Sequence, residues 1–173
     1  HISVKNGKFS SNYIVHCIGS SYPEINIAYK DDALLDYGFI LMSPKFKIED
    51  ETITYLLIID SNGVPRFRKK LNLSATDFKV HDNGYYSYIE RTTRNEFNHW
   101  DNDIVILDTE FDEITRLNTI GLNQTDNHDF LISDEGTFIL MSYNSIYRDM
   151  SDYGLSDNEL TRDSVIQEID DQG

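Results

Sequence analysis

Phe39-Ile40-Leu41-Met42-Ser43 recurs as Phe138-Ile139-Leu140-Met141-Ser142, 99 residues later in a chain of 173 residues. A chance match of five residues in so short a chain is improbable, so the pair indicates an internal duplication. The pentapeptide, FILMS, is apolar and contains residues typical of β-strands. The residues on either side of the two copies therefore decide whether a larger unit repeats.

The segments that follow the two copies occur in the same order. Tyr55–Asp60 is an apolar strand pattern that ends in Asp, and the turn residues Ser61-Asn62-Gly63 come next. Ser164–Asp170 and Asp171-Gln172-Gly173 have the same arrangement. Asp can cap such a turn with its carboxylate, and Gly accepts the positive φ that a hairpin imposes.

A middle copy lies between these two. Asp77–Tyr86 aligns with Asp129–Phe138 at a spacing of 52 residues, and Phe39 precedes Tyr86 by 47, so the two spacings add up to 99. Each unit contains four strand patterns joined by turns. In the second unit these are Asp77–His81, Tyr85–Arg91, Asp103–Asp108 and Glu113–Thr119. In the first unit, Glu24–Tyr29 is expected to be the first strand and FILMS the second.

Four antiparallel strands in a repeat of about 40–50 residues are typical of a β-propeller blade. The predicted fold class is therefore all-β, with about three four-stranded blades at residues 23–72, 76–122 and 127–173, the last one strand short. Residues 1–22 are either an N-terminal extension or a strand that closes the ring. The polar stretch Tyr147–Arg162 is expected to be a loop, with one helical turn near Asp157–Leu160.

Three blades do not close a ring, because propellers typically have about four to eight. We therefore expect this chain to be part of a longer propeller or to be completed by another chain. The alternative architecture is a β-sandwich of about 12 short strands in which the repeated pentapeptide is a coincidence.

Composition limits the function classes. With 39% hydrophobic residues the chain can bury a core, and its net charge of −15 repels a phosphate backbone, so nucleic-acid binding is not expected. No apolar run of about 18 residues predicts a membrane span. Cys17 is the only cysteine, which excludes an internal disulfide and a Cys-x-x-Cys site.

Several segments resemble the N-terminal half of arylsulfotransferases of the aryl-sulfate sulfotransferase type. The resemblance covers most of the chain from Pro23 onward and rests on the order and spacing of its parts. These are Pro23–Ala28, Gly38–Leu41, Tyr55–Gly63, Asp77–Lys79, His128–Phe130 and Asp163–Asp170. It implies a six-bladed propeller, of which this chain would hold about half.

The resemblance also implies an activity for the full-length protein. Enzymes of that family transfer sulfate from a phenolic sulfate ester to a phenol without a cofactor, through a sulfated histidine. That histidine belongs to a later blade of the family, so this chain alone is expected to be inactive. An aryl sulfate and a phenol are the implied partners, and the periplasm or the extracellular space is the implied location.

His128 is the site residue that the resemblance carries over. It opens a predicted innermost strand, where side chains face the central channel, and it would donate a hydrogen bond to a sulfuryl oxygen. The alternative is that His128 orients the loop that enters the strand. Thr76 stands at the equivalent place in the second unit, so the histidine is not a general feature of the repeat. Asp129 is expected to be structural, accepting hydrogen bonds from backbone N–H groups.

Arg148 follows the second FILMS strand and is a weaker candidate for sulfate binding, through its planar fork of donors. The commoner fate of such a residue is a surface salt bridge, here to Asp149 or Asp152. The acidic residues between Asp149 and Asp163 could chelate Ca²⁺, but they lack EF-hand spacing, and a solvated acidic loop is favoured. The five histidines are not at metal-ligand spacings, so neither a metal nor a cofactor is expected.

Two functions from different classes follow. The first is a fragment of an arylsulfotransferase-like enzyme that binds an aryl sulfate in its channel. The second is a non-catalytic propeller module for binding or scaffolding, because the fold hosts many functions. A third hypothesis, a subunit that polymerises by strand or blade pairing, is motivated by the unfinished third blade.

Overall fold

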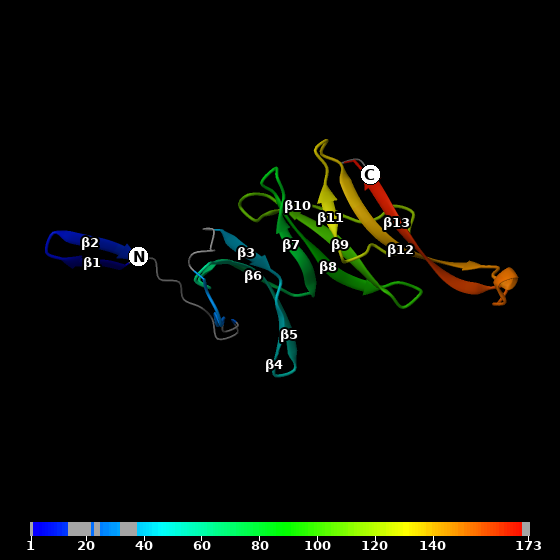
Figure 1. The fold of residues 1–173 in the computed structure, drawn as a ribbon, viewed down its shortest axis with the longest axis horizontal. Coiled ribbons are helices and arrows are strands. Elements are labelled where there is room, and N and C mark those ends of the chain that lie inside the picture. The colour runs from blue at the N-terminus through cyan, green and yellow to red at the C-terminus, as the bar shows by residue number, and fades with distance from the viewer. Residues whose placement is uncertain (1, 14–21, 23–24, 32–37, 171–173) are drawn as a thin grey trace.

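The computed structural model describes residues 2–13, 22, 25–31 and 38–170. These residues form thirteen strands and one single-turn 3-10 helix, η1 (Ser151–Tyr153). The fold is all-β with antiparallel sheets, as the sequence predicts, and no α-helix occurs in the described part (Figure 1). β1 (Ile2–Asn6) and β2 (Phe9–Tyr13) pair only with each other among the described residues, as a hairpin apart from the other sheets.

Sheet 1 is built around one long strand, β5 (Glu51–Asp60). The C-terminal half of β5 pairs with β3 (Phe39–Met42), and its N-terminal half pairs with β4 (Lys45–Ile48) along the same edge. β6 (Pro65–Leu71) pairs with the other edge of β5. Ser43-Pro44 separates β3 from β4, since proline has no N–H to give to a ladder. β3 and β4 are thus one interrupted strand.

Sheet 2 is a four-stranded meander. β7 (Ala75–Val80), β8 (Tyr86–Arg94), β9 (Trp100–Leu107) and β10 (Glu113–Leu117) pair in chain order, each with the next. The four strands expected in the second unit are confirmed, with bounds that differ by at most three residues. The sequence is informative here because each strand is short, apolar at its centre and bounded by turn residues.

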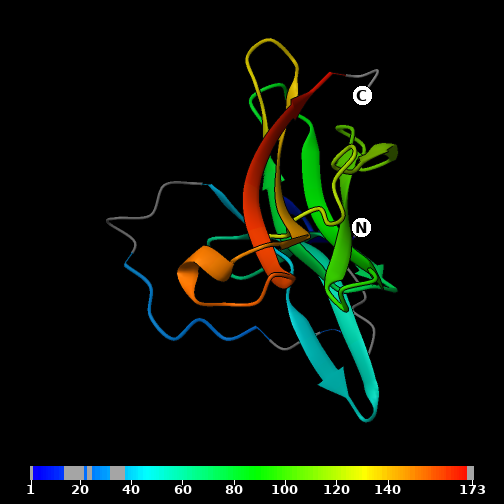
Figure 2. The same ribbon diagram turned by 90° about the vertical axis from the view of Figure 1, so that its right-hand side faces the viewer.

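Sheet 3 contains β11 (Phe130–Ile132), β12 (Phe138–Arg148) and β13 (Glu159–Ile169), in this order. β12 and β13 pair without interruption from Phe138–Ile169 to Arg148–Glu159, as one long curved ribbon that ends at η1 (Figure 2). The prediction of a loop over Tyr147–Arg162 is therefore wrong at both ends. The helical turn lies at Ser151–Tyr153 instead of Asp157–Leu160. Polar residues here form a ribbon exposed on both faces, which composition alone does not separate from a loop.

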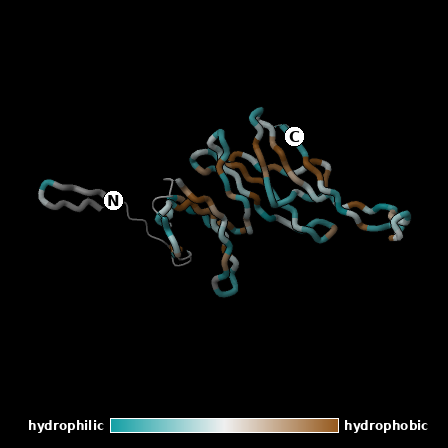
Figure 3. The backbone as a smooth tube through the Cα atoms, in the orientation of Figure 1, coloured by the Kyte–Doolittle hydropathy of each residue, from teal (hydrophilic) through white to brown (hydrophobic). Residues whose placement is uncertain are grey.

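The three sheets pack face to face in chain order, and hydrophobic segments lie at their centres (Figure 3). Alternate residues of β9 point to opposite sides, so that Val105 and Leu107 join the core against sheet 1 while Ile104 and Ile106 join the core against sheet 3. Sheet 2 is thus buried on both faces. The far face of sheet 1 is covered by Tyr22 and Ile25.

The turns after β5 and β9 have the same hydrogen bonds. Oδ1 of Asp60 accepts from the N–H groups of Asn62 and Val64, at 2.9 and 3.0 Å, and Oδ1 of Asp108 accepts from Glu110 and Asp112, both at 2.9 Å. Asp60 and Asp108 are therefore equivalent positions of the repeat. The role predicted for the strand-ending Asp is confirmed at Asp60, whereas the turn predicted after Asp170 lies outside the described residues.

This equivalence corrects the alignment of the two FILMS segments. Phe39 pairs with Asp60 itself, whereas Phe138 pairs with Ile169, the residue before Asp170. The structural repeat between sheets 1 and 3 is thus 98 residues, one fewer than the spacing of the pentapeptides. Because side chains alternate along a strand, a one-residue shift exchanges the two faces. Both segments form strands as expected, but their residues are not equivalent.

Another element differs from the prediction. Residues 25–29 form no strand, and residue 24 lies outside the described part. Ile25 instead packs on the Ile53–Tyr55–Leu57 cluster, and Nζ of Lys30 donates to Oδ1 of Asn62 at 2.7 Å, so this segment lies against the β5–β6 turn. Sheet 1 consequently has no strand along the free edge of β3 among the described residues. The described sheets are open, and none closes on itself or into a ring.

The outer face of sheet 3 has no covering layer among the described residues. The 52-residue repeat makes Met141 equivalent to Ile89, and the register then makes Ile166, opposite Met141, equivalent to Ile104, opposite Ile89. Ile104 is fully buried under sheet 3, whereas Ile166 is 73% exposed. The outer face thus presents apolar residues at positions that are interior in sheet 2.

Candidate functional site

His128 is held by a buried aspartate. It lies in the turn that precedes β11, two residues before that strand begins, and not in the strand itself. Its Nδ1 is 2.8 Å from Oδ2 of Asp126, and its backbone N–H donates to the same oxygen at 2.9 Å. The Asp126 side chain is almost fully buried, but the His128 side chain is 69% exposed. These bonds agree with the alternative that His128 orients this loop, and both roles of His128 stay predictions.

A polar network fixes Asp126 between sheets 2 and 3. The Asp126 N–H donates to the carbonyl of Met141 at 2.8 Å, which ties the connector to β12. Nδ2 of Asn102 donates to the Thr125 carbonyl at 2.6 Å, and the Thr125 N–H donates to Oδ1 of Asp101 at 2.8 Å, which ties it to β9. The backbone that carries the Asp126 carboxylate is therefore held by hydrogen bonds to both sheets. Because His128 is bonded to this carboxylate, its position is fixed as well.

The pair has the geometry of a histidine oriented for chemistry. Since Asp126 accepts from Nδ1, the imidazole presents Nε2 to solvent, where it can accept a proton or donate to an anion according to its protonation state. The Tyr143 ring lies edge-on at 6.4 Å, and the Arg162 guanidinium lies 5.6 Å from the same tyrosine ring. An aromatic ring thus lies beside the imidazole, and a cation lies beside that ring.

Arg148 is placed far from this pair. Its Nη1 donates to Oδ1 of Asp163 at 2.6 Å, and its Nη2 donates to Oδ2. These bonds raise the pKa of Arg148 and lower the pKa of Asp163. Arg148 lies five residues beyond Tyr143 on β12, which is about 16 Å along a strand. The structure therefore does not bring Arg148 and His128 together, and the salt bridge expected to Asp149 or Asp152 forms with Asp163.

Lys79 and Asp129 join β7 of sheet 2 to the residues just before β11 of sheet 3. Nζ of Lys79 lies 2.5 Å from Oδ1 of Asp129 and 2.7 Å from Oδ2 of Asp77. The hydrogen bond from Lys79 lowers the pKa of Asp129, whereas burial raises the pKa of Asp77. Oδ1 of Asp129 also accepts from the Phe130 N–H at 2.8 Å, which agrees with the structural role expected for it. Lys79 is thus neutralised by two carboxylates.

Beyond that ion pair, a groove of about 460 Å³ runs between β7 and β11 and their following turns. His81 lies on its wall, with Nε2 2.8 Å from Oγ of Ser87 and its ring edge-on to Phe130. Burial and the charge of Lys79 lower the pKa of His81, which keeps the imidazole neutral at physiological pH. The groove is therefore neutral on the His81 side and acidic at Asp82 and Asp134.

A second concavity, the aromatic hollow, opens between sheets 1 and 2. Its volume is about 400 Å³. Its residues come from β3, β5, β6, β7, β8 and the turn after β9: Phe39, Leu41, Ile58, Arg66, Phe67, Val80, Tyr86 and Phe111. Phe67 and Phe111 stack at 3.8 Å, and Tyr86 lies 4.6 Å from Phe111. Phe39, 61% exposed, stands at the mouth.

Among the described residues, Arg66 is the only cation that lines the aromatic hollow. Its Nε and Nη2 both donate to Oδ2 of Asp60, at 3.0 and 2.6 Å, which leaves Nη1 for a ligand. Burial alone would raise the pKa of Asp60, but the bonds from Val64, Asn62 and Arg66 outweigh it and hold that pKa below its usual value. The guanidinium is thus fixed in place by a carboxylate that stays ionised.

Sequence reasoning located His128 but missed its partner and the hollow. Asp126 lies two residues before His128, so an Asp-x-His pattern was available as a signal. The aromatic hollow had no such signal, because its rings come from segments up to 72 residues apart, from Phe39 to Phe111. Only the packing of one sheet on the next brings them together.

Comparison with known proteins found no match: no family model, no curated protein and no solved structure resembles the chain significantly. Within the described ranges, no group of three or more His, Cys, Asp or Glu side chains is placed to hold a metal ion. No helix in that part of the chain is long and apolar enough to cross a membrane.

Proposed function

We propose that this chain is a non-catalytic binding module of propeller type, and that the aromatic hollow binds an aromatic ring bearing an anionic group. One observation carries the proposal: rings from three strands and a turn meet in an open concavity that has a single arginine on its wall. The packing of three antiparallel sheets, each on the next in chain order, supports a module of this type.

The repeat geometry supports the propeller-type architecture. Equivalent residues point the same way in successive sheets: Ile58 faces sheet 2 as Ile106 faces sheet 3, and both lie two residues before a turn-capping Asp. A stack with this regularity can be extended by a further sheet on the exposed face of sheet 3. Each sheet then offers its inner edge to a shared central space, as in propeller blades.

The ligand class follows from the lining. A volume of about 400 Å³ lies within the range of small-molecule sites, about 300–1,000 Å³. The stacked Phe67 and Phe111 rings and the exposed Phe39 favour a planar ring, which gains from ring–ring contact. Nη1 of Arg66 suits a sulfate or carboxylate on that ring, because a guanidinium binds oxyanions with directed N–H groups. Aryl sulfates belong to this class.

The site is proposed as a binding site because, among the described residues, no histidine, cysteine, serine, threonine or carboxylate lines it. His128 lies between sheets 2 and 3, while the aromatic hollow lies between sheets 1 and 2. Sulfate transfer remains the second candidate function, favoured by the Asp126–His128 pair. In that case the exposed Nε2 would act on a ligand held elsewhere in the full-length protein.

A single probe, 4-nitrophenyl sulfate, tests both functions. Calorimetric titration should show binding, and Arg66→Gln should weaken it about tenfold through the loss of one charge-assisted hydrogen bond. Lys70→Gln is the matched control, since it removes one charge from the same strand outside the hollow. 4-Nitrophenol, which has no sulfate, should bind equally well to the wild type and to Arg66→Gln.

The outcomes separate the candidates. No binding, or equal loss of binding in Arg66→Gln and Lys70→Gln, would contradict the proposed site. Release of 4-nitrophenolate after a phenol acceptor is added would favour sulfate transfer. Such release should then disappear in His128→Ala and fall in Asp126→Asn, whose folding is checked by thermal unfolding.

A further inference from the structure

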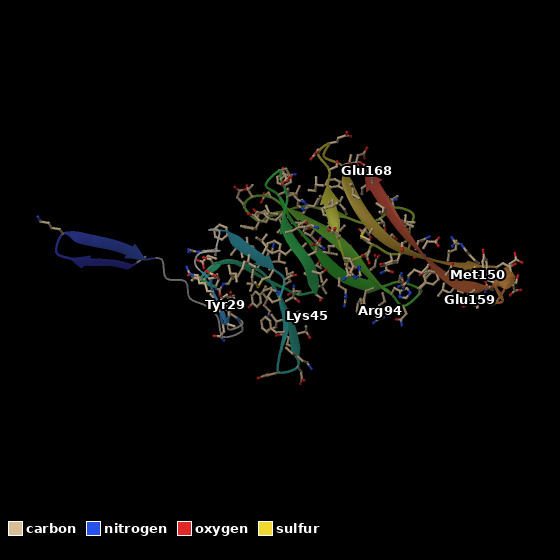
Figure 4. All side chains as sticks on the ribbon, in the orientation of Figure 1. Tyr29, Lys45, Arg94, Met150, Glu159 and Glu168 are labelled. Atoms are coloured by element: carbon tan, nitrogen blue, oxygen red, sulfur yellow. The ribbon has the colours of Figure 1, made fainter. Side chains whose placement is uncertain are left out.

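Two arginines lie against one tryptophan at the turn end of the β8–β9 hairpin. The guanidinium carbon of Arg94 is 4.5 Å from the centroid of the Trp100 ring, and that of Arg91 is 5.4 Å from it. Figure 4 shows Arg94 near the free end of this hairpin. Trp100 is 38% exposed, so solvent reaches the group. Arg91, Arg94 and Trp100 are called the Trp100 cluster below.

A β-bulge in β8 brings both arginines to the same face. Side chains three residues apart on a regular strand point to opposite faces. Here the register shifts between Arg91 and Arg94, so that Arg91 pairs with Asn102 and Arg94 pairs with Trp100. Asn102 and Trp100 are two residues apart and share a face of β9, so both arginines lie on the side of the indole. Bulges re-aim side chains in this way beside functional sites.

The bulge is not a general feature of the repeat. β12 and β13 pair in sheet 3 without a register shift. The 52-residue repeat places Tyr143 and Ile146 where Arg91 and Arg94 stand in β8. The fold of the repeat therefore requires neither the bulge nor the two arginines.

The hairpin turn holds Arg94 in place. Its Nη1 donates to the carbonyl and to Oδ1 of Asn98, at 2.5 and 3.0 Å. Oδ1 of Asn95 accepts from two backbone N–H groups of the turn, at 3.1 and 3.0 Å, and Nδ2 of Asn95 donates to the Asn123 carbonyl at 2.7 Å. The turn is thus closed on itself and tied to the connector before β11. A guanidinium that is already ordered loses less conformational entropy when it binds a ligand.

Neither arginine of the Trp100 cluster has a carboxylate partner among the described residues. By contrast, Arg66, Arg116 and Arg148 each form a salt bridge with a carboxylate. The carboxylate next to the tryptophan in sequence, that of Asp101, accepts from the Thr125 N–H at 2.8 Å and so points to the connector. In a chain with a net charge of −15, two adjacent cations without a carboxylate are a local exception.

His99, directly before β9, agrees with a positive field at this place. Burial lowers the pKa of His99, and the charges of Arg162 and Arg94 lower it further. A neighbouring carboxylate would act in the opposite direction. Arg162, on β13, is thus a third cation close to the hairpin turn.

The free donors of the cluster suit one tetrahedral oxyanion. A guanidinium that lies on an aromatic ring keeps its N–H groups at its edge, where they bind phosphate or sulfate in a directed way. The N–H groups of Arg91, and the Nε and Nη2 groups of Arg94, have no acceptor among the described residues. The net charge of −15 opposes a long polyanion, whereas a single oxyanion needs only the local cations.

We propose that the Trp100 cluster binds a phosphate or sulfate group through the guanidiniums of Arg91 and Arg94. The group is either a free ion or an ester on a larger molecule, and the same donors recognise both. The site is separate from the aromatic hollow, which lies between sheets 1 and 2 and uses Arg66. Its hairpin belongs to sheet 2, which is packed between sheets 1 and 3, so a further sheet on the outer face of sheet 3 would not cover it.

Trp100 is the only tryptophan of the chain, so its fluorescence reports on this site alone. Iodide should quench that fluorescence more strongly than caesium does, in spite of the net charge of −15, because the local field is positive. Acrylamide, which is neutral, measures the exposure of the indole. Inorganic phosphate or sulfate should reduce iodide quenching to a plateau, and sodium chloride at equal ionic strength should have a smaller effect.

Variants assign the effect to the two arginines. Arg91→Gln and Arg94→Gln should each weaken phosphate binding about tenfold through the loss of charge-assisted hydrogen bonds, with thermal unfolding as the check on folding. Arg94→Lys keeps the charge without the planar fork and should weaken binding less than Arg94→Gln. Lys45→Gln, on β4 of sheet 1, is the control of equal charge change and should bind as the wild type does (Figure 4). Arg66→Gln should also leave phosphate binding unchanged.

The outcomes decide between a built site and general electrostatics. Equal quenching by iodide and caesium, or equal effects of phosphate and chloride, would overturn the proposal. Equal weakening in Lys45→Gln and Arg94→Gln would overturn it as well. Glycerol phosphate distinguishes the sources: tighter binding than inorganic phosphate supports an ester as the ligand, and weaker binding supports the free ion.

Discussion

The two copies of FILMS have identical sequences and opposite surroundings. In β3, Phe39 and Ile40 are mostly exposed and Leu41 is half-buried against sheet 2. In β12, Leu140 is fully buried against sheet 2, and Ile139 and Met141 are on the outer face. The cause is the one-residue shift against the following strand, which places Phe39 opposite Asp60 and Phe138 opposite Ile169. Identical pentapeptides therefore do not mark equivalent positions in this repeat.

The largest difference in stability should be found between substitutions of the two FILMS leucines, Leu41 and Leu140. Leu140→Ala should lower the free energy of unfolding by about 2–5 kcal/mol, because it leaves a cavity between sheets 2 and 3. Leu41→Ala should cost about 1 kcal/mol, because this side chain is only partly buried at the rim of the aromatic hollow. Urea unfolding measures both. Equal losses would mean that the two copies occupy the same environment.

A smaller effect on stability is expected from substitution of Asp60, the residue that pairs with Phe39. The pKa of Asp60 is lowered in the folded chain, so its stabilising contribution is present above the unfolded pKa of about 3.9 and is lost as pH falls through the folded value. Asp60→Asn should therefore be less stable than the wild type at pH 7, and this difference should shrink below about pH 4.

Two further variants test the role of Asp60. One removes its arginine partner, Arg66, and the other changes Ile169, the residue that pairs with the second FILMS copy. Arg66→Gln removes part of what lowers the pKa of Asp60 in the folded chain, so in that background the pH-dependent part of the difference should be smaller and its loss should be complete at a higher pH. The second copy faces Ile169, which does not titrate, and Ile169→Val should lower stability by the same amount at pH 7 and pH 3.5. A difference between Asp60→Asn and the wild type that stays constant from pH 7 to pH 3 would contradict the assignment.

Much of the fold could be predicted from the sequence, because the signals for strands and turns are local. The strands of sheet 2 are short apolar segments between turns with Gly, Asn and Asp, and such local signals predict both type and position. Register is a property of two strands and their turn together. FILMS alone could not reveal that its two copies differ by one residue, and the polar composition of Tyr147–Arg162 could not show that both flanks of η1 stay paired.

Less of the candidate site could be predicted from the sequence. His128 was carried over through the resemblance, but the aspartate that holds it was overlooked, and Arg148 was a candidate because it follows the second FILMS strand and has a planar fork of donors. Arg148 is the last residue of β12, whereas His128 precedes β11, and sequence order says little about the distance between them. The aromatic hollow depends on which faces of sheets 1 and 2 meet, which in turn depends on the register of β3.

The smallest effect should come from the part of β12 that has no counterpart in β3. β3 ends before Pro44, while β12 continues to Arg148, whose guanidinium pairs with Asp163 on the exposed ribbon. Arg148→Ala, Asp163→Ala and the double variant should show weak coupling in urea unfolding, close to the detection limit, because both side chains are exposed to solvent. The coupling should fall further at high salt.

The same variants separate a structural role for Arg148 from a functional one. If Arg148 only pairs with Asp163, Arg148→Ala should bind 4-nitrophenyl sulfate as well as the wild type does, while Arg66→Gln should not. Loss of ligand binding in Arg148→Ala, with stability unchanged, would restore Arg148 as a site residue. It would also mean that the distal end of the β12–β13 ribbon approaches a ligand in the assembled protein, which its bidentate bond to Asp163 argues against.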